Sequence, residues 1–379
     1  MADLLQRAGQ GQRDRAHLLQ QRIVVIEHLR MRHTAILPQR RGRRHPRRPY
    51  AERMASIPLL VDFDPGIDDA IALSYLAAHP EVEIAGLIAT GGNVEVGLVH
   101  RNALVLAELL GIDAPIARGA ERPLVQEPMY ADDTHGPSGI GHAKLPEPIL
   151  AGDPRSGAQL WVDLARARPG ELVALVLGPH TNLALALEIE PELPRLLKRL
   201  HIMGGAINHR GNTGPTSEWN IAVDPEAAQR VLVAFTGAPQ RPVLGSLEAT
   251  EAVRFTQDTL DRFVALVETT GHPVAQILVD ALRFYFEFHE ADGFGWMAHV
   301  HDPLVTAHAV TGDFAATRPL AVDVELAGTL TRGQTVGDEL GRWGREPNVE
   351  VLTDVRAAEF IGHLLETLQN GLVRTGRRG

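Results

Sequence analysis

Apolar and polar positions alternate in blocks along most of the chain, and the blocks have the lengths of strands and helices. The run "IPLLVDF" at 57–63 predicts a buried strand, and "DDAIALSYLAAH" at 68–79 has the spacing of an amphipathic helix. A second strand, "VEIAGLIAT" at 82–90, precedes a second helical pattern, "LVHRNALVLAELLG", which ends at Gly111. Strands that alternate with helices of this length are typical of βαβ units and a mostly parallel sheet.

The same alternation continues to the C-terminus. Further strands are predicted at "APIARG" (114–119), "ELVALVL" (171–177), "LHIMGGA" (200–206) and "RPVLGS" (241–246), with helical spacing at 181–189, 224–235 and 256–290. The segment 348–368 again predicts a strand followed by a helix. Because no repeat or change of composition divides this part, we expect one doubly wound α/β domain over residues 56–379, with a mostly parallel central sheet and a Rossmann-like core.

Polar clusters follow several of the predicted strands at the point where each strand ends. They are "DFDPGIDD" (62–69), "TGGN" (90–93), "GPHTN" (178–182) and "MGGA" (203–206). A single glycine-rich turn is explained by tight backbone geometry alone. In open parallel sheets, however, ligands bind outside the carboxyl ends of the strands. Several turns that also carry acidic or amide side chains therefore predict a shared pocket.

Composition narrows the class of protein. The chain of 379 residues is 44% apolar and 22% charged, which is ordinary for a globular protein. Its lack of cysteine excludes disulfides, thiolate zinc sites and cysteine nucleophiles. The sequence has neither an apolar run of the roughly 18 residues that a membrane span needs nor a signal-peptide pattern, so we expect a cytoplasmic protein without a membrane partner.

The N-terminal segment differs from the rest in charge. Residues 1–53 hold thirteen arginines and four acidic residues, a net charge of +9, so the remainder carries −19 of the total of −10. We interpret 1–55 as a basic N-terminal extension outside the domain, either a solvated tail or the product of a start site placed before Met54. An arm that binds nucleic acid is the less favoured alternative.

The strongest chemical signal is the group of four aspartates at the end of the first strand, Asp62, Asp64, Asp68 and Asp69. Several carboxylates buried together require protons or a cation to neutralise them. Oxygen ligands without histidine or cysteine suit Ca²⁺ or Mg²⁺ rather than zinc. Capping of the following helix by Asp68 or Asp69 is an alternative, but it explains one aspartate and not four.

The spacing D-x-D-P-G-x-D-D resembles the N-terminal signature of the inosine-uridine-preferring nucleoside hydrolases. Other segments resemble this family in the expected order: "ATGGNVEVGLVHRNALVLAELLG", "GPHTNLALAL", "IMGGA", "GNTGPTSEWNIAVDPEAA" and "HDPLVTAH". The resemblance runs from about residue 57 to the end. It implies an enzyme that uses a bound Ca²⁺ to hydrolyse the N-glycosidic bond of ribonucleosides, releasing base and ribose, and that assembles as a homodimer or homotetramer.

The resemblance also implies roles for individual residues at the metal and the sugar. Its calcium ligands correspond to Asp64, Asp69, Asp302 and the main-chain carbonyl of Thr181, and Asp64 would also be the general base toward water. The substrate-binding residues around the ribose and the attacking water would be Asp68, Asn93, Met203, Asn212, Glu218 and Asn220. Carboxylates and amides around the sugar suit this chemistry, because cleavage develops positive charge on the ribose ring.

Three further residues correspond to the family's base site. His301, just before Asp302, matches a histidine that protonates the leaving base in one branch of the family. His135 lies in a segment, "DDTHGPSGIGH", that resembles the flap over the base pocket, and Trp219 stands where an aromatic residue commonly follows the sugar-binding glutamate. A histidine at 135, instead of the tryptophan of the purine-restricted branch, favours a non-specific or pyrimidine-accepting enzyme.

Two other function classes stay open. "LLVDFDPG" has part of the D-x-D-x-T pattern of phosphatases with an aspartate nucleophile, although Gly66 stands where that pattern has threonine or valine. A non-catalytic protein that binds a nucleoside or a sugar would use many of the same side chains. Release of free ribose from a nucleoside separates the hydrolase from both.

Overall fold

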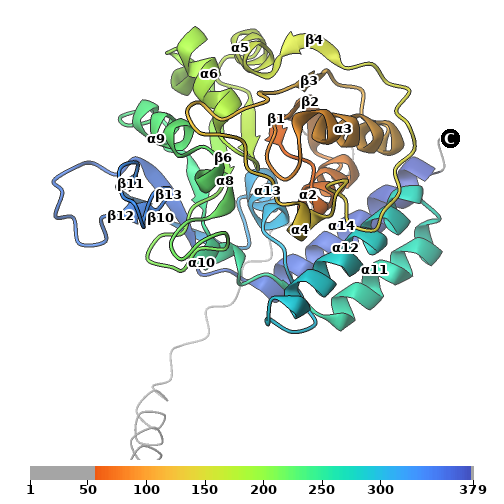
Figure 1. Cartoon of the computed structure of the whole chain (residues 1–379). Helices are drawn as coiled ribbons and strands as arrows, with labels where there is room; N and C mark the ends of the chain where they lie inside the picture. The colour runs from red at the N-terminus through yellow and green to blue at the C-terminus, as the bar shows by residue number, and fades with distance from the viewer. Residues whose placement is uncertain (1–55, 377–379) are drawn as a thin grey trace, which may run out of the picture. The chain divides into compact units, whose positions relative to one another are not determined.

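The computed structural model describes residues 56–376, and their architecture is the expected doubly wound α/β fold. Among these residues nine strands form one sheet in the order β10-β13-β7-β6-β5-β1-β2-β3-β4 (Figure 1). The strands are β1 (Ile57–Phe63), β2 (Val82–Ala89), β3 (Ile116–Arg118), β4 (Asp153–Ser156), β5 (Val173–Val176), β6 (Arg199–Met203), β7 (Val243–Gly245), β10 (Ala316–Leu320) and β13 (Val349–Thr353). Neighbouring strands pair in parallel, except that β10 runs antiparallel to β13.

Helices cover both faces of the sheet (Figure 1). One face carries α2 (Ile67–Ala78), α3 (Val96–Leu110), α11 (Gln257–Thr270), α12 (Pro273–Ala291), α13 (Asp302–Thr311) and α14 (Ala357–Gly376). The other carries α5 (Gly157–Ala167), α6 (Thr181–Ile189) and α9 (Pro225–Ala234). The remaining short elements are α4 (Asp132–His135), α7 (Leu193–Leu196), α8 (Trp219–Val223), α10 (Leu247–Thr250), and the pairs β8 (Arg254–Phe255) with β9 (Ala298–His299) and β11 (Val322–Val324) with β12 (Thr335–Gly337).

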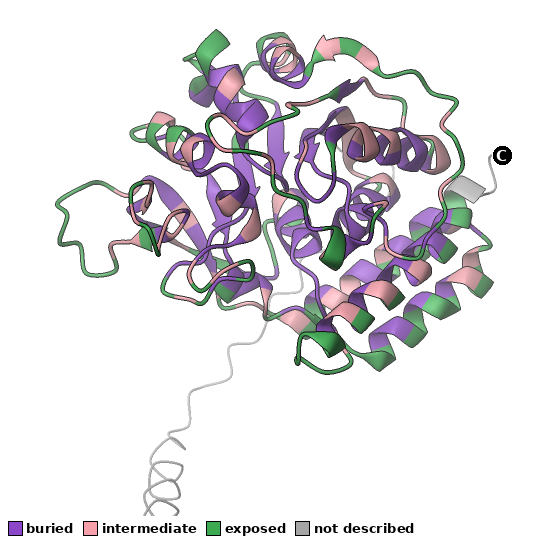
Figure 2. Cartoon of the chain, in the orientation of Figure 1, coloured by how far each residue is buried: buried purple, intermediate pink, exposed green. Residues whose placement is uncertain are grey.

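Strand β1 lies at the centre of the sheet and is buried on both sides. Leu59 and Val61 belong to the apolar core under α2, whereas Leu60 belongs to the core under α5 and α6, as the alternation of a strand requires. A strand buried on both faces is a continuous apolar run, which is why "IPLLVDF" could be identified in the sequence. Figure 2 shows that the buried residues are concentrated in the central strands and on the helix faces that cover them.

Two glycines allow the turns after β2 and β5 to approach the end of β1. A Cβ atom at Gly178, directly after β5, would lie 2.6 Å from Asp64 Oδ1, and one at Gly92 would also clash with this carboxylate. These turns therefore need glycine because the Asp64 side chain occupies the space that a larger residue would fill. Within residues 56–376, no helix is both long and apolar enough to span a bilayer. The basic segment, and with it the nucleic-acid interpretation, lies outside the described residues.

Candidate active site

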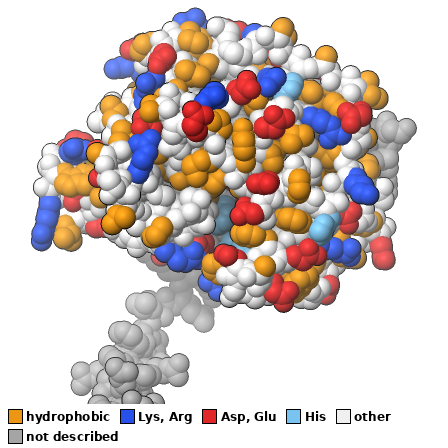
Figure 3. Space-filling view, viewed as in Figure 1, with side chains coloured by type: hydrophobic (Ala, Val, Ile, Leu, Met, Phe, Trp, Pro, Cys, Tyr) orange, Lys and Arg blue, Asp and Glu red, His pale blue; other side chains and the backbone are white. Residues whose placement is uncertain are grey.

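A cavity of about 590 Å³ opens at the carboxyl ends of the strands, where the sequence predicts a pocket. Its lining brings together residues that are far apart in the sequence. The predicted site residues among them are Asp64, Asp68, Asp69, Asn93, His135, Met203, Asn212, Glu218, Trp219, Asn220, His301 and Asp302. On the face of the molecule in Figure 3, histidine and acidic side chains are visible near the centre, among hydrophobic and neutral ones. The lining combines acidic side chains with imidazole and aromatic rings.

The acidic part of the lining is built by the first turns of two helices. Carboxylate oxygens of Asp68 and Asp69, from α2, and of Asp302, from α13, lie within 4.8 Å of one another, and all three residues are buried. Burial raises the pKa of Asp69 to about 7, with a further contribution from the charge of Asp68, and burial also raises the pKa of Asp302 well above its usual value. Asp69 Oδ1 is buried without a hydrogen-bond partner among the described residues. An all-oxygen donor set with an unsatisfied carboxylate oxygen fits a hard divalent cation.

Asp64 lies beside this trio and is fixed by Asn93. The main-chain N–H of Asn93 donates to Asp64 Oδ2 at 2.8 Å, and its side-chain amide donates to the main-chain carbonyl of Asp64 at 2.9 Å. Burial and the charges of Asp69 and Asp68 raise the pKa of Asp64 well above its usual value. Thr181 does not line the cavity, and its hydroxyl donates to Asp224 Oδ2 at 2.7 Å. The four-ligand set of Asp64, Asp69, Thr181 and Asp302 stays a prediction, and the geometry adds Asp68 to the group of possible ligands.

Asp62 has a structural role outside the trio, and Asp69 has a second role at the start of its helix. Asp62 is fully buried outside the cavity lining and accepts hydrogen bonds from the hydroxyl of Thr90, from Trp161 Nε1 at 2.7 Å and from Asn182 Nδ2 at 2.9 Å. Burial raises its pKa to about 6. Asp69 also takes part in capping α2, because its Oδ2 accepts the N–H of Gly66 at the start of that helix. The alternative interpretation of this aspartate as a helix cap is therefore partly correct.

The stretch that is predicted to bind the sugar, residues 211–228, contributes one wall of the cavity. Glu218 caps α8 and accepts main-chain N–H groups of Gly205 and Asn220, both at 2.9 Å. Its pKa is raised to about 7 by burial. Asn220 Nδ2 donates to the carbonyl of Leu177, at the end of β5, at 2.7 Å, and Asn212 Oδ1 accepts the N–H of Trp219 at 2.9 Å. These bonds hold the wall against the ends of β5 and β6.

His301 and His135 lie beside the acidic side chains, and both are buried and line the cavity. His301 Nδ1 lies 2.8 Å from the hydroxyl of Thr250, and its main-chain N–H donates to Asp68 Oδ2 at 3.3 Å. His135 Nδ1 accepts the N–H of Ile67 at 3.2 Å, so its neutral ring carries the proton on Nε2. Burial lowers the pKa of His301 to about 3 and that of His135 to about 4.

Several aromatic and histidine residues of the lining were not singled out in the sequence. They are Tyr285, Phe288 and His289 from α12, Phe294 from the loop after it, and His299 from β9. His135 and Tyr285 have ring centroids 5.5 Å apart, and the His299 and His301 rings stack at 6.2 Å. The only signal was the density of aromatic residues in "FYFEFHEADGF" (284–294), which at helical spacing indicates core packing as readily as a binding site.

Comparison with known proteins assigns the chain to a family. Residues 59–362 match the family described as inosine-uridine preferring nucleoside hydrolase. The chain belongs to this family. It is 36% identical over 315 residues to the pyrimidine-specific ribonucleoside hydrolase RihA of Citrobacter koseri, an alignment that covers 83% of this chain and 98% of that protein.

Solved structures agree with this assignment. The purine-preferring ribonucleoside hydrolase of Gardnerella vaginalis superposes with a TM-score of 0.77 at 27% identity, covering 83% of this chain and 99% of that one. A plant nucleoside hydrolase superposes with a TM-score of 0.75 at 28% identity, covering 82% and 98%. The protein is thus a nucleoside hydrolase, an enzyme that acts on N-glycosyl bonds, as the sequence predicts. Its relatives include both pyrimidine-specific and purine-preferring enzymes.

Proposed function

We propose that this nucleoside hydrolase cleaves ribonucleosides to base and ribose with the help of Ca²⁺ and that it accepts pyrimidine nucleosides. The observation that carries the metal requirement is the buried trio of Asp68, Asp69 and Asp302, whose oxygens lie within 4.8 Å of one another. Three carboxylates at this distance repel one another unless protons or a cation compensate their charge. Carboxylate oxygens are the ligands that Ca²⁺ prefers, and a bound Ca²⁺ would orient and polarise the attacking water.

The residues around the metal site divide the remaining chemistry. Asp64 takes a proton from the water as its oxygen attacks C1′ of the ribose, and Asn93 holds Asp64 in place through two hydrogen bonds. Asp68, Asn212, Glu218 and Asn220 bind the ribose hydroxyls and stabilise the positive charge on the ring. Met203 lines the same wall of the cavity.

The bond from C1′ to the base breaks with its electron pair on the base, which therefore needs a proton. His301 supplies this proton in the proposed mechanism. Its ring is neutral at rest because burial lowers its pKa to about 3. As negative charge develops on the departing base, the ring takes up a proton from solvent, passes it to the base and returns to the neutral form. His135 and Trp219 lie at the same cavity and contact the base. The support for a pyrimidine base is His135 together with the pyrimidine-specific relative.

The test is a panel of uridine, cytidine, inosine and adenosine, assayed for free ribose after treatment with EDTA and after addition of Ca²⁺ or Mg²⁺. We expect ribose release, loss of activity with EDTA, recovery with Ca²⁺ and the highest kcat/KM for a pyrimidine nucleoside. A higher kcat/KM for inosine or adenosine than for either pyrimidine nucleoside would contradict the proposed base preference. Elemental analysis of active protein that finds no divalent ion would contradict the metal site.

We propose a homodimer or homotetramer, which light scattering would identify.

A further inference from the structure

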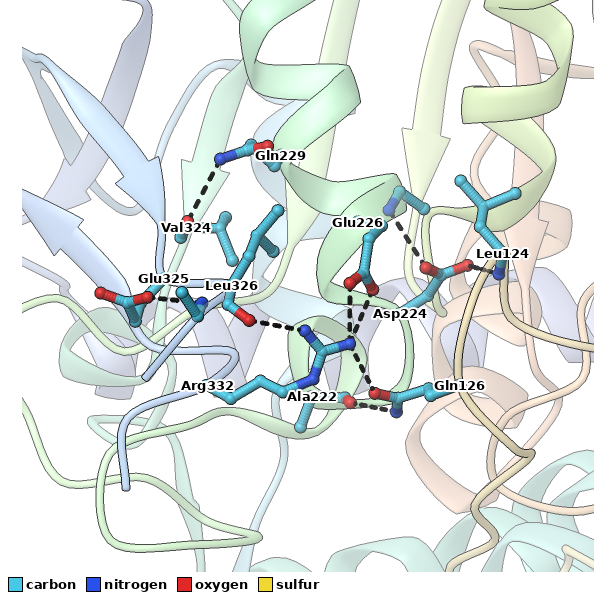
Figure 4. A network of polar contacts seen from close by, with 12 residues as sticks. Leu124, Gln126, Ala222, Asp224, Glu226, Gln229, Val324, Glu325, Leu326 and Arg332 are labelled. Carbon is cyan, nitrogen blue, oxygen red and sulfur yellow. Dashed lines mark hydrogen bonds and ion pairs between the residues drawn. The ribbon is translucent and has the colours of Figure 1, made fainter. Parts of the chain in front are cut away.

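Figure 4 shows a polar network centred on Arg332, a residue that does not line the active-site cavity. Arg332 belongs to the segment between β11 and β12. Its Nη2 donates to both carboxylate oxygens of Glu226 at 2.8 Å and to Gln126 Oε1 at 3.2 Å, and its Nη1 donates to the carbonyl of Leu326 at 2.8 Å. The planar guanidinium thus joins three separate segments of the chain, which a lysine could not do with the same geometry.

The segment that contains Gln126 leads directly into the cavity wall. Gln126 donates from Nε2 to the carbonyls of Ala222 and Val223, both at 2.8 Å, at the end of helix α8. Met129 and Tyr130, a few residues further on, line the cavity, as does His135. Gln126 therefore connects the segment that carries His135 to the helix that begins at Trp219, and Arg332 holds Gln126 by its remaining amide atom.

The main chain around Arg332 reaches the other end of the same helix. The carbonyl of Arg332 accepts the hydroxyl of Ser217 at 2.9 Å, directly before Glu218. Gly333 follows with a φ of +80°, and a Cβ there would lie 3.3 Å from both Ala222 Cα and Ser217 Oγ. The segment thus packs closely along α8, so a shift of the Arg332 region would be transmitted to Glu218 and Asn220.

We propose that Arg332 is a positioning residue, which fixes the segment 126–135 and the sugar-binding residues 217–223 relative to each other. It acts through Gln126, Glu226 and Ser217 and not by contact with the substrate. The side chain of Arg332 is 34% exposed and that of Glu226 20%, so the ion pair is partly screened and adds little to global stability. The proposal rests on nucleoside hydrolysis by this family and not on the identity of the metal or the preferred base.

The test compares Arg332→Gln with Arg230→Gln. Arg230 lies on α9 close to Glu226, and it pairs with Glu188 of α6, away from both cavity segments, so this variant makes the same charge change on a neighbouring surface ion pair. For uridine or inosine, whichever the wild type cleaves faster, we expect Arg332→Gln to raise KM by about 5-fold or more, because the two sides of the substrate site lose their fixed spacing. Its kcat should fall less than KM rises, and Tm should fall by less than about 3 °C. Arg230→Gln should leave KM and kcat unchanged.

Glu226→Gln and the double variant with Arg332→Gln complete the design. Arg332 and Glu226 form one ion pair, so Glu226→Gln alone should also raise KM. The double variant should raise KM no further than Arg332→Gln does. If Arg332→Gln fails to fold, Gln126→Leu carries the same expectation for KM. An unchanged KM in folded variants, or a fall in Tm without a change in KM, would show that Arg332 is only structural. Equal effects of Arg332→Gln and Arg230→Gln would also overturn the proposal.

Discussion

At the scale of single residues, the proposed role of His301 requires that a side chain that is neutral at rest protonates a leaving group. Its Nδ1 is engaged by the Thr250 hydroxyl at 2.8 Å, which leaves Nε2 as the ring nitrogen available to a ligand in the cavity. Burial lowers its pKa to about 3, whereas the nearby charge of Asp68 acts in the opposite direction. The proton affinity of this ring therefore depends on the charge in the cavity, and a departing base changes that charge.

The residue-scale prediction separates His301 from the residues that act on water. His301→Ala should lower kcat for uridine or inosine by about 10²–10⁴-fold, because these bases leave poorly without a proton. Hydrolysis of p-nitrophenyl riboside should be largely spared, since its leaving group is stable as an anion. Asp64→Asn is the matched comparison and should impair every substrate, because in the proposed mechanism Asp64 acts on the water. Equal losses on natural and activated substrates for His301→Ala would contradict the general-acid role, and a rise in KM alone would indicate base binding.

At the scale of elements, the parts of the site that follow buried strands were predicted from the sequence. Strand β1 and helix α2 have the expected positions, since a strand buried on both faces is a continuous apolar run. Helix α2 was predicted to be amphipathic, but 11 of its 12 residues are buried, because other helices pack around it. The pair β11–β12 and the segment of Arg332 were not predicted, because short strands with polar loops carry no such periodicity. The aromatic wall from α12 was predicted only as a helix, since its cavity-facing residues become distinct only when β9 and α4 pack against it.

The turn after β5 gives the element-scale prediction. A Cβ at Gly178 would lie 2.6 Å from Asp64 Oδ1 and 3.1 Å from the main-chain nitrogen of Asp64. Gly178→Ala should therefore displace Asp64 and lower kcat/KM by about 10²-fold while the protein stays folded. Gly362→Ala is the control, because nothing lies within 4 Å of a Cβ at this position in α14, and alanine favours the helix. Steady-state kinetics with circular dichroism checks both, and wild-type kinetics for Gly178→Ala would mean that the turn has room to adjust.

At the scale of the whole molecule, the raised pKa values of the buried acidic residues make stability depend on pH, and the proposed metal site adds a dependence on a cation. Burial raises the pKa of Asp69 and of Glu218 to about 7, compared with ordinary values of 3.8 and 4.5. A carboxyl group whose pKa is higher in the folded than in the unfolded protein binds its proton more tightly when folded. Its contribution to stability is complete below the ordinary pKa and is lost as pH rises through about 7.

The whole-molecule prediction follows from that sign. Without a divalent cation, Tm should be lower at pH 8 than at pH 5.5, because the buried carboxylates then carry charge that no cation compensates. Ca²⁺ binds ionised carboxylates and stabilises the folded state in proportion to its affinity, so the rise in Tm on adding Ca²⁺ should be larger at pH 8 than at pH 5.5. Thermal unfolding with EDTA and with Ca²⁺ at both pH values checks this.

Asp69→Asn removes one ionisable group from the trio of Asp68, Asp69 and Asp302, and it should reduce both the stabilisation by Ca²⁺ and its dependence on pH. A Ca²⁺ effect on Tm that is the same at both pH values would contradict binding at these carboxylates.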